Sequence, residues 1–137
     1  MTPMETIDYQ NVNEELLSAI PELASRYEKE AEWRANVGGR PGPYDVICYV
    51  LKPLLRHLLD SDNDPALLKR IFSFFEQMAR SSDIQVVNLL HVGIFEGLIG
   101  ERDRLVTAWK YMGEESKNVA RRAAHARRRD HNLPDAV

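Results

Sequence analysis

The segment that most constrains the fold of this 137-residue chain is DIQVVNLLHVGIFEGLIG, residues 83–100. It is long enough for several helical turns and apolar on nearly every side, which is typical of a helix surrounded by others. Asp83 can cap its start by accepting hydrogen bonds from backbone N–H groups, and Gly100 can adopt the left-handed conformation that ends it. We therefore expect a central helix covered by its neighbours.

Apolar residues at three- and four-residue spacing predict further helices on both sides of this segment. Asn13 is expected to cap the first of them, and Asp64 followed by Pro65 is a cap and a first-turn proline. The periodicity continues across Pro53, which indicates one kinked helix there and not two. The expected ranges are 14–20, 21–33, 44–59, 65–79, 101–112 and 114–129.

These segments predict an all-α fold of five to six antiparallel helices, arranged as a HEAT-like helical stack or as a compact bundle. The helical pair that starts near Tyr44 recurs near Asp83, about 40 residues later, which is the period of HEAT-type pairs. In an antiparallel arrangement the turn at 60–64 and the turn at 100–103 lie at the same end. We define the acidic residues of these turns as the rim: Asp60, Asp62, Asp64, Glu101 and Asp103.

The charge distribution predicts three parts: a flexible N-terminus at 1–12, a helical domain at 13–116 and a basic C-terminal helix or tail at 117–137. Up to residue 116 the chain has 12 Lys and Arg against 19 Asp and Glu, a net charge of −7, whereas the remainder has 6 against 2, a net charge of +4. Such asymmetry suggests two different surfaces. The tail offers a possible second contact through Arg121, Arg122, Arg127, Arg128 and Arg129.

Composition also narrows the functional classes. The single Cys48 cannot form an internal disulfide, and the sequence has neither an apolar leader nor a membrane-length apolar run, so we expect a cytoplasmic protein without membrane contact. The glycine- and proline-rich stretch at 35–43 lacks the Gly-Lys-Ser/Thr of a phosphate loop and is interpreted as a connector. We expect no cofactor, no metal and no small-molecule substrate.

Three polar residues of the central segment could suggest catalysis. Asn88 and Glu96 are eight positions apart on one helical face, whereas His91 is five positions from Glu96 and is therefore expected to point elsewhere. Cys48 and His57 lie beside another helical face, with no motif that orders them. We expect no active site, and an enzyme built on these residues is the weakest of the alternatives.

Four stretches together resemble a known family: IPEL at 20–23, IFSFFEQM at 71–78, VNLLHVGIFEGL at 87–98 and MGEESK at 112–117. They are similar to small all-helical bacterial immunity proteins of contact-dependent growth inhibition and other polymorphic toxin systems, over residues 14–119. The resemblance implies an antitoxin, a protein that binds a cognate toxin C-terminal domain and blocks its active site or its access to substrate. It brings no catalytic residues.

The residues are compatible with that function. An acidic rim on a helical scaffold could mimic the anionic substrate of a nuclease toxin and would speed encounter with a basic partner. The alternative is a nucleic-acid-binding adaptor that uses the arginine-rich C-terminal segment. Nucleic acid is the less favoured partner, because cations also suit a helix C-terminus and the body of the chain is acidic.

Overall fold

The computed structural model describes residues 7–135, and all regular structure in that part of the chain is helical, which confirms the expected all-α fold. The described residues form seven helices, where five to six were expected. No helix among them is long and apolar enough to cross a membrane.

Two of the seven helices contain a π-helical stretch and two others are flanked by short 3-10 turns. The first half of the chain has α1 (Val12–Ala19), a 3-10 turn (Pro21–Leu23), α2 (Ala24–Asn36), α3 (Pro43–Asp45), a π-helical segment (Val46–Leu51), α4 (Lys52–Ser61) and α5 (Pro65–Ala79). The second half has α6 (Ile84–Leu90), a π-helical segment (His91–Phe95), α7 (Glu96–Ile99), α8 (Arg102–Trp109), α9 (Glu114–Ala126) and a 3-10 turn (Asp130–Asn132). Because α3, segment 46–51 and α4 are continuous, we refer to them together as helix 43–61. In the same way α6, segment 91–95 and α7 together form helix 84–99.

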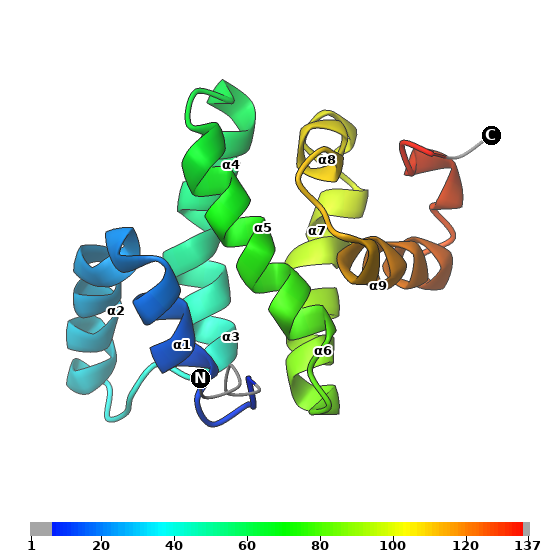
Figure 1. The fold of residues 1–137 in the computed structure, drawn as a ribbon. Coiled ribbons are helices and arrows are strands. Elements are labelled where there is room, and N and C mark those ends of the chain that lie inside the picture. Colours follow the sequence, from blue (N-terminus) through cyan, green and yellow to red (C-terminus); the bar gives the residue numbers. More distant parts are fainter. Residues whose placement is uncertain (1–6, 136–137) are drawn as a thin grey trace, which may run out of the picture.

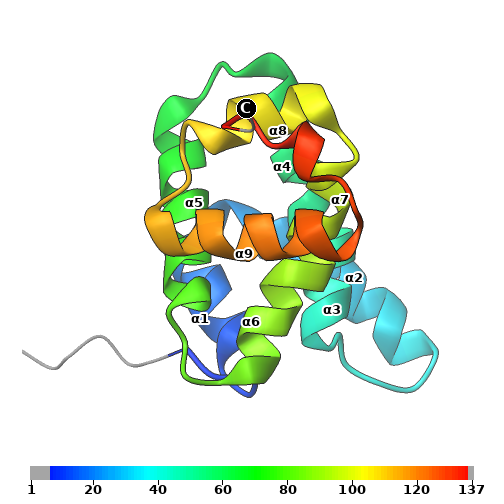
Figure 2. The ribbon, with the colours of Figure 1, turned by 90° about the vertical axis from the view of Figure 1, so that its right-hand side faces the viewer.

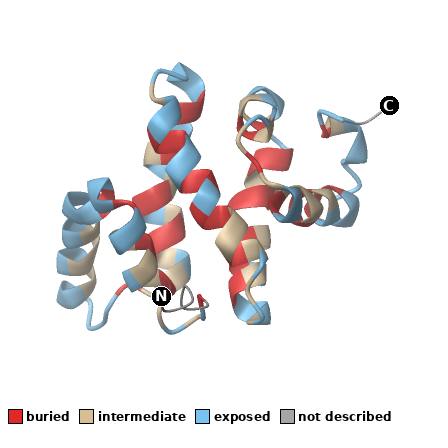
Figure 3. Ribbon diagram, in the orientation of Figure 1, coloured by how far each residue is buried: buried red, intermediate tan, exposed pale blue. Residues whose placement is uncertain are grey.

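Three long helices form the middle of the molecule. Helix 43–61, α5 and helix 84–99 pack against one another, with α1 and α2 on one side and α8 and α9 on the other (Figure 1). The last helix, α9, runs across α5 and helix 84–99 and does not continue the antiparallel order (Figure 2). One apolar core lies where these helices face each other (Figure 3).

Helix 84–99 has the central place that its composition predicts, and Asp83 caps it by accepting a hydrogen bond from the Gln85 backbone N–H at 3.0 Å. Most of its apolar side chains are buried, but Ile84 and Val92 are 67% and 48% exposed. The helix therefore keeps one stripe open to solvent.

The prediction that Gly100 adopts the left-handed conformation is wrong, because the φ of Gly100 is −83°. The helix ends instead by tightening its last turn: the N–H of Gly100 bonds to the Gly97 carbonyl and that of Glu101 to the Leu98 carbonyl. Such i→i−3 bonds satisfy the terminal carbonyls without a glycine at positive φ.

The helix around Pro53 is continuous, as expected, and the backbone widens to a π-helix directly before it. The N–H of Lys52 bonds to the carbonyl of Ile47, five residues back. The second π-helical stretch, in helix 84–99, packs against this one. A Cβ on Gly93 would lie 3.0 Å from Cγ2 of Ile47, so glycine is what allows the two helices to approach here.

The start of the chain differs from expectation. Helix α1 begins at Val12, not after Asn13, because Asp8 and Asn11 exchange side-chain to backbone hydrogen bonds that form the preceding turn. Asn13 lies inside the helix and donates to the Pro41 carbonyl. Of the N-terminus expected to be flexible, residues 1–6 lie outside the described residues, whereas 7–12 are packed, with Ile7 buried.

The boundary expected between 116 and 117 falls inside α9, which belongs to the same core as the other helices. Its buried face consists of Ser116, Val119 and three alanines, Ala120, Ala123 and Ala124. Small side chains let a helix approach its neighbours closely, so this thin apolar face is sufficient for burial.

A carboxylate from α5 caps the start of α9. Glu76 accepts hydrogen bonds from the backbone N–H groups of Glu115, at 3.1 Å, and Ser116, at 2.8 Å. Burial by itself raises the pKa of Glu76, but the bonds from Ser116 and Glu115 outweigh it, and the pKa lies below the ordinary value of 4.5. Glu76 thus supplies the cap that Gly113, which has no side-chain oxygen, cannot supply.

Replacing Glu76 by Gln should lower the free energy of unfolding by about 1–3 kcal/mol at neutral pH. The reason is that the two N–H groups at the start of α9 lose a charged hydrogen-bond acceptor. The depressed pKa means that this stabilisation is present above pH 4.5 and is lost as the pH falls through the folded-state pKa. Urea denaturation at several pH values measures both effects. Glu14→Gln, on the exposed side of α1, is the control. If Glu76→Gln were still less stable than the natural protein at a pH below the folded-state pKa of Glu76, the prediction would be contradicted.

Gly113→Ala should be destabilising through the same cap. The backbone of Gly113 is extended and accepts any residue, but a Cβ there would lie 2.5 Å from Cδ of Glu76 and would displace the carboxylate. The substitution should therefore cost about 1–3 kcal/mol in the natural chain and almost nothing in a Glu76→Ala background. Equal costs in the two backgrounds, measured by urea denaturation, would show that the glycine acts in another way.

Candidate functional site

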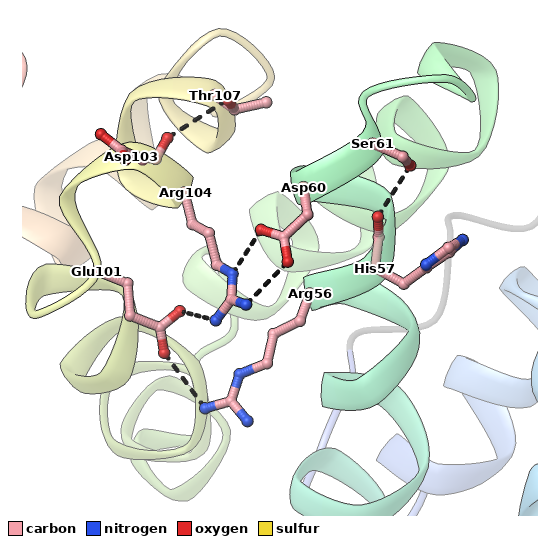
Figure 4. Close-up of polar contacts among 8 residues, drawn as sticks. All are labelled: Arg56, His57, Asp60, Ser61, Glu101, Asp103, Arg104 and Thr107. Atoms are coloured by element: carbon pink, nitrogen blue, oxygen red, sulfur yellow. Dashed lines mark hydrogen bonds and ion pairs between the residues drawn. The ribbon is translucent and has the colours of Figure 1, made fainter.

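The two turns that carry the rim lie side by side in the structure, as the antiparallel arrangement predicts. Arg104, at the start of α8, reaches across to Asp60, at the end of α4, with Nε and Nη2 lying 2.7 and 2.8 Å from the two carboxylate oxygens (Figure 4). This is a bidentate pair, the most directional form of ion pair available to arginine. The rim is therefore a joined structure and not two independent turns.

Local sequence shapes each turn. Asp62 ends α4 in the left-handed conformation, with a φ of 46°, which aspartate tolerates better than most residues. Asp64 then caps α5 by accepting a hydrogen bond from the Leu67 backbone N–H at 3.1 Å, with Pro65 in the first turn as expected. The carboxylate of Asp64 thus already serves a helix end.

Glu101 adds a second link from the start of α8 to α4, through Arg56. Its two carboxylate oxygens accept from Nη1 of Arg104 at 2.6 Å and from Nη2 of Arg56 at 3.2 Å (Figure 4). On the other side of the rim, Asp62 accepts from the Tyr111 hydroxyl at 2.9 Å and lies 3.4 Å from Nζ of Lys110. Three of the five rim carboxylates, Asp60, Asp62 and Glu101, are therefore paired with cations.

The rim is much closer to neutral than its acidic residues suggested. Its five carboxylates lie among four cations, Arg56, Arg102, Arg104 and Lys110, which leaves a net charge of −1. Among the described residues, two rim carboxylates have no ion pair, Asp64 and Asp103. Sequence reasoning missed Arg56, Lys110 and Tyr111 as members, because their partners are more than 40 positions away.

These contacts shift the titration of the rim. Hydrogen bonds from Arg104 hold the pKa of Asp60 below its ordinary value, and the bonds to Asp60 and Glu101 raise the pKa of Arg104. The bond to Asp62 raises the pKa of Tyr111. The Asp60 carboxylate and the Arg104 guanidinium are therefore charged throughout the physiological pH range.

The five arginines of the C-terminal segment do not form one surface. Arg121 pairs with Asp135 at 2.8 Å and with Glu114 at 3.5 Å, and Arg127 pairs with Glu96. Arg122, Arg128 and Arg129 are exposed and have no ion pair with the residues that the structure describes. Two of the five are thus engaged within the molecule.

Among the polar residues of helix 84–99, His91 and Glu96 do meet, which corrects the expectation that they point apart. Nε2 of His91 lies 3.7 Å from Oε2 of Glu96. Five residues separate them, and the π-helical stretch that starts at His91 turns once in about that interval, where an α-helix would have turned further. Asn88 is exposed on the outer stripe.

Within residues 7–135, no group of three His, Cys, Asp or Glu side chains is placed to hold a metal ion. His57 is exposed and Cys48 half-buried, with no contact between them and the His91–Glu96 pair among the polar contacts of the described chain. The structure therefore brings together the rim, one His–Glu pair and no larger cluster of chemically active groups in the part it describes.

The fold and the rim define a small all-helical domain with a charged surface at one end. Residues 13–127 match the model of a family described as a domain of unknown function (DUF7674), and the chain belongs to this family. The match includes α9 and excludes the segment after Arg127. Comparisons with curated proteins and with solved structures gave no match.

Removing the Arg104 side chain should raise the pKa of Asp60 towards its ordinary value, because the bidentate bond is its main cause of depression. NMR titration of the Asp60 carboxyl in Arg104→Ala measures this shift. Arg102→Ala, two positions earlier and exposed, is the matched control and should leave Asp60 unchanged. If both variants gave the natural titration curve, the pair would be broken in solution.

Proposed function

We propose that this protein is an immunity protein, which binds a cognate bacterial toxin domain through the rim and neutralises it. The observation that carries the proposal is the joined rim, in which Arg104 holds Asp60 and Glu101 in one arrangement at the end of the molecule. The resemblance of four core stretches to immunity proteins of polymorphic toxin systems supports the same function.

The rim side chains are held in place by ion pairs, and this favours binding of a partner. Asp60 and Arg56 are about half exposed while each is fixed by an ion pair, so little side-chain entropy remains to be lost on binding. A preorganised surface of this kind suits tight binding, and it suits neutralisation because an antitoxin must remain bound to its toxin.

The arrangement of charges on the rim says more about the partner than the net charge of the rim does. A net charge of −1 gives only weak attraction to a basic nuclease, whereas alternating carboxylates and cations demand a partner with the opposite alternation. Specificity for one toxin among many therefore comes from the pattern, and blocking of the toxin's active site or of its access to substrate comes from the bulk of the helical domain.

The nucleic-acid-binding adaptor is not favoured by the arrangement of the basic residues. Arg121 and Arg127 form ion pairs with carboxylates of the same chain, whereas phosphate binding needs cations that are free to pair with phosphates and so displace the counterions of the nucleic acid.

The partner to test is a toxic C-terminal domain, to be sought in the gene immediately upstream of this one. Asp60→Lys and Asp62→Lys should each weaken its binding by at least about tenfold, because each places like charges opposite the partner's cations. Calorimetry with the purified toxin domain measures the affinity, and growth of cells producing both proteins measures neutralisation. Glu14→Lys on α1 is the control for a surface charge reversal away from the rim.

If the rim variants bound and protected as well as the control, the rim would not be the interface. If the natural protein failed to bind any neighbouring toxin domain, the immunity function itself would be refuted.

A further inference from the structure

A second surface lies between α2 and the π-helical segment 46–51. Trp33 of α2 and Tyr49 of that segment line a hollow of about 380 Å³, together with Glu30 and Arg34. Both aromatic side chains are more than half exposed, at 55% for Trp33 and 63% for Tyr49. Two aromatic residues thus face solvent across one opening.

Helix α2 differs from the other long helices because it has no buried side chain. Within it, Ala24 is exposed and Tyr27 and Ala31 are half-buried, and the buried Leu23 lies in the 3-10 turn that precedes it. Trp33 therefore contributes little to the core of this chain. Tryptophan, tyrosine and arginine are the residue types that most often dominate the energy of protein interfaces, and all three line this hollow.

The walls of the hollow are held in place before any partner arrives. The guanidinium of Arg34 lies 5.3 Å from the centre of the Trp33 ring and pairs with Glu30, at 3.4 Å, and with Asp45. Tyr49 is directed outward because Val50 and Leu51, which follow it, are buried. An occupant would meet a preformed aromatic slot and would not have to order it.

Charge complementarity selects an uncharged occupant, because Glu30 and Arg34 pair with each other and the lining carries no net charge. Hydrogen bonding adds a second condition. Neither the indole N–H of Trp33 nor the hydroxyl of Tyr49 bonds to another residue within 7–135. The slot therefore offers aromatic faces and donors, and its ligand must bring acceptors and apolar surface.

A proline-rich segment meets these conditions. In the polyproline II conformation its backbone carbonyls are free acceptors, its prolines have no N–H, and its rings pack against aromatic side chains at a low entropy cost. We propose that the Trp33–Tyr49 slot binds an extended, uncharged, proline-rich segment of a partner protein. This site is separate from the rim and does not depend on the immunity function.

The test uses the full chain and a synthetic oligoproline peptide, with a glycine–serine peptide of equal length as the unrelated probe. Calorimetry gives the affinity, and the NMR signal of the Trp33 indole N–H reports where the peptide binds, with Trp109 as the internal reference. Trp33→Ala and Tyr49→Ala should each weaken binding by about tenfold or more. Tyr49→Phe removes only the hydroxyl donor and should weaken it less.

Ile84→Ala is the matched control, since Ile84 is equally exposed but lies on helix 84–99, and it should leave the affinity unchanged. Trp33→Ala should fold normally, because Trp33 is on a helix without buried side chains, and its melting curve verifies this. The proposal would be overturned if oligoproline did not bind, if the glycine–serine peptide bound equally well, or if the signal of Trp109 moved and that of Trp33 did not.

Discussion

The contact of Gly93 with Ile47 sets the relation between the two halves of this molecule. Because glycine has no side chain, helix 84–99 can approach helix 43–61 until the two π-helical stretches touch. The turns that follow these two helices lie side by side, and Arg104 joins Asp60 of one turn to Glu101 of the other. The rim therefore depends on two helices that are close to each other in the core as well as on the charges at their ends.

Widened helical turns affect the surface as well as the core. In helix 43–61 the π-helical stretch 46–51 buries four apolar residues and leaves Tyr49 exposed, opposite Trp33. In helix 84–99 the stretch 91–95 brings His91 to Glu96. π-Helical turns are rare and are often found at functional sites. Here the one beside Trp33 forms part of a preformed slot, whereas the one at His91 forms an isolated pair whose glutamate is also bound by Arg127.

The two surfaces that the molecule presents differ in chemistry. At the rim, charges are many and mutually paired, which favours recognition by a matching pattern of charge. At the Trp33–Tyr49 slot, the charges cancel and aromatic area is left exposed, which favours an uncharged ligand. They use different parts of helix 43–61, since the rim lies at the end of α4 beside the start of α8 and the slot lies at segment 46–51 beside α2. A protein of this size can therefore hold two partners without the same residues serving both.

The sequence by itself determined the all-helical class, the central place of helix 84–99, the cap at Asp83 and the adjacency of the rim turns, because these follow from apolar periodicity and from short connections. It could not show the pairing of the rim, since Arg104 and Asp60 are 44 positions apart. It also placed His91 and Glu96 apart by assuming α-helical turns, and it set a boundary between 116 and 117, inside α9, because the net charge changes sign there. Only the tertiary structure decided these features. Which charges pair, how wide a helical turn is and how closely two helices approach all depend on which surfaces pack together, and a local sequence pattern does not specify that packing.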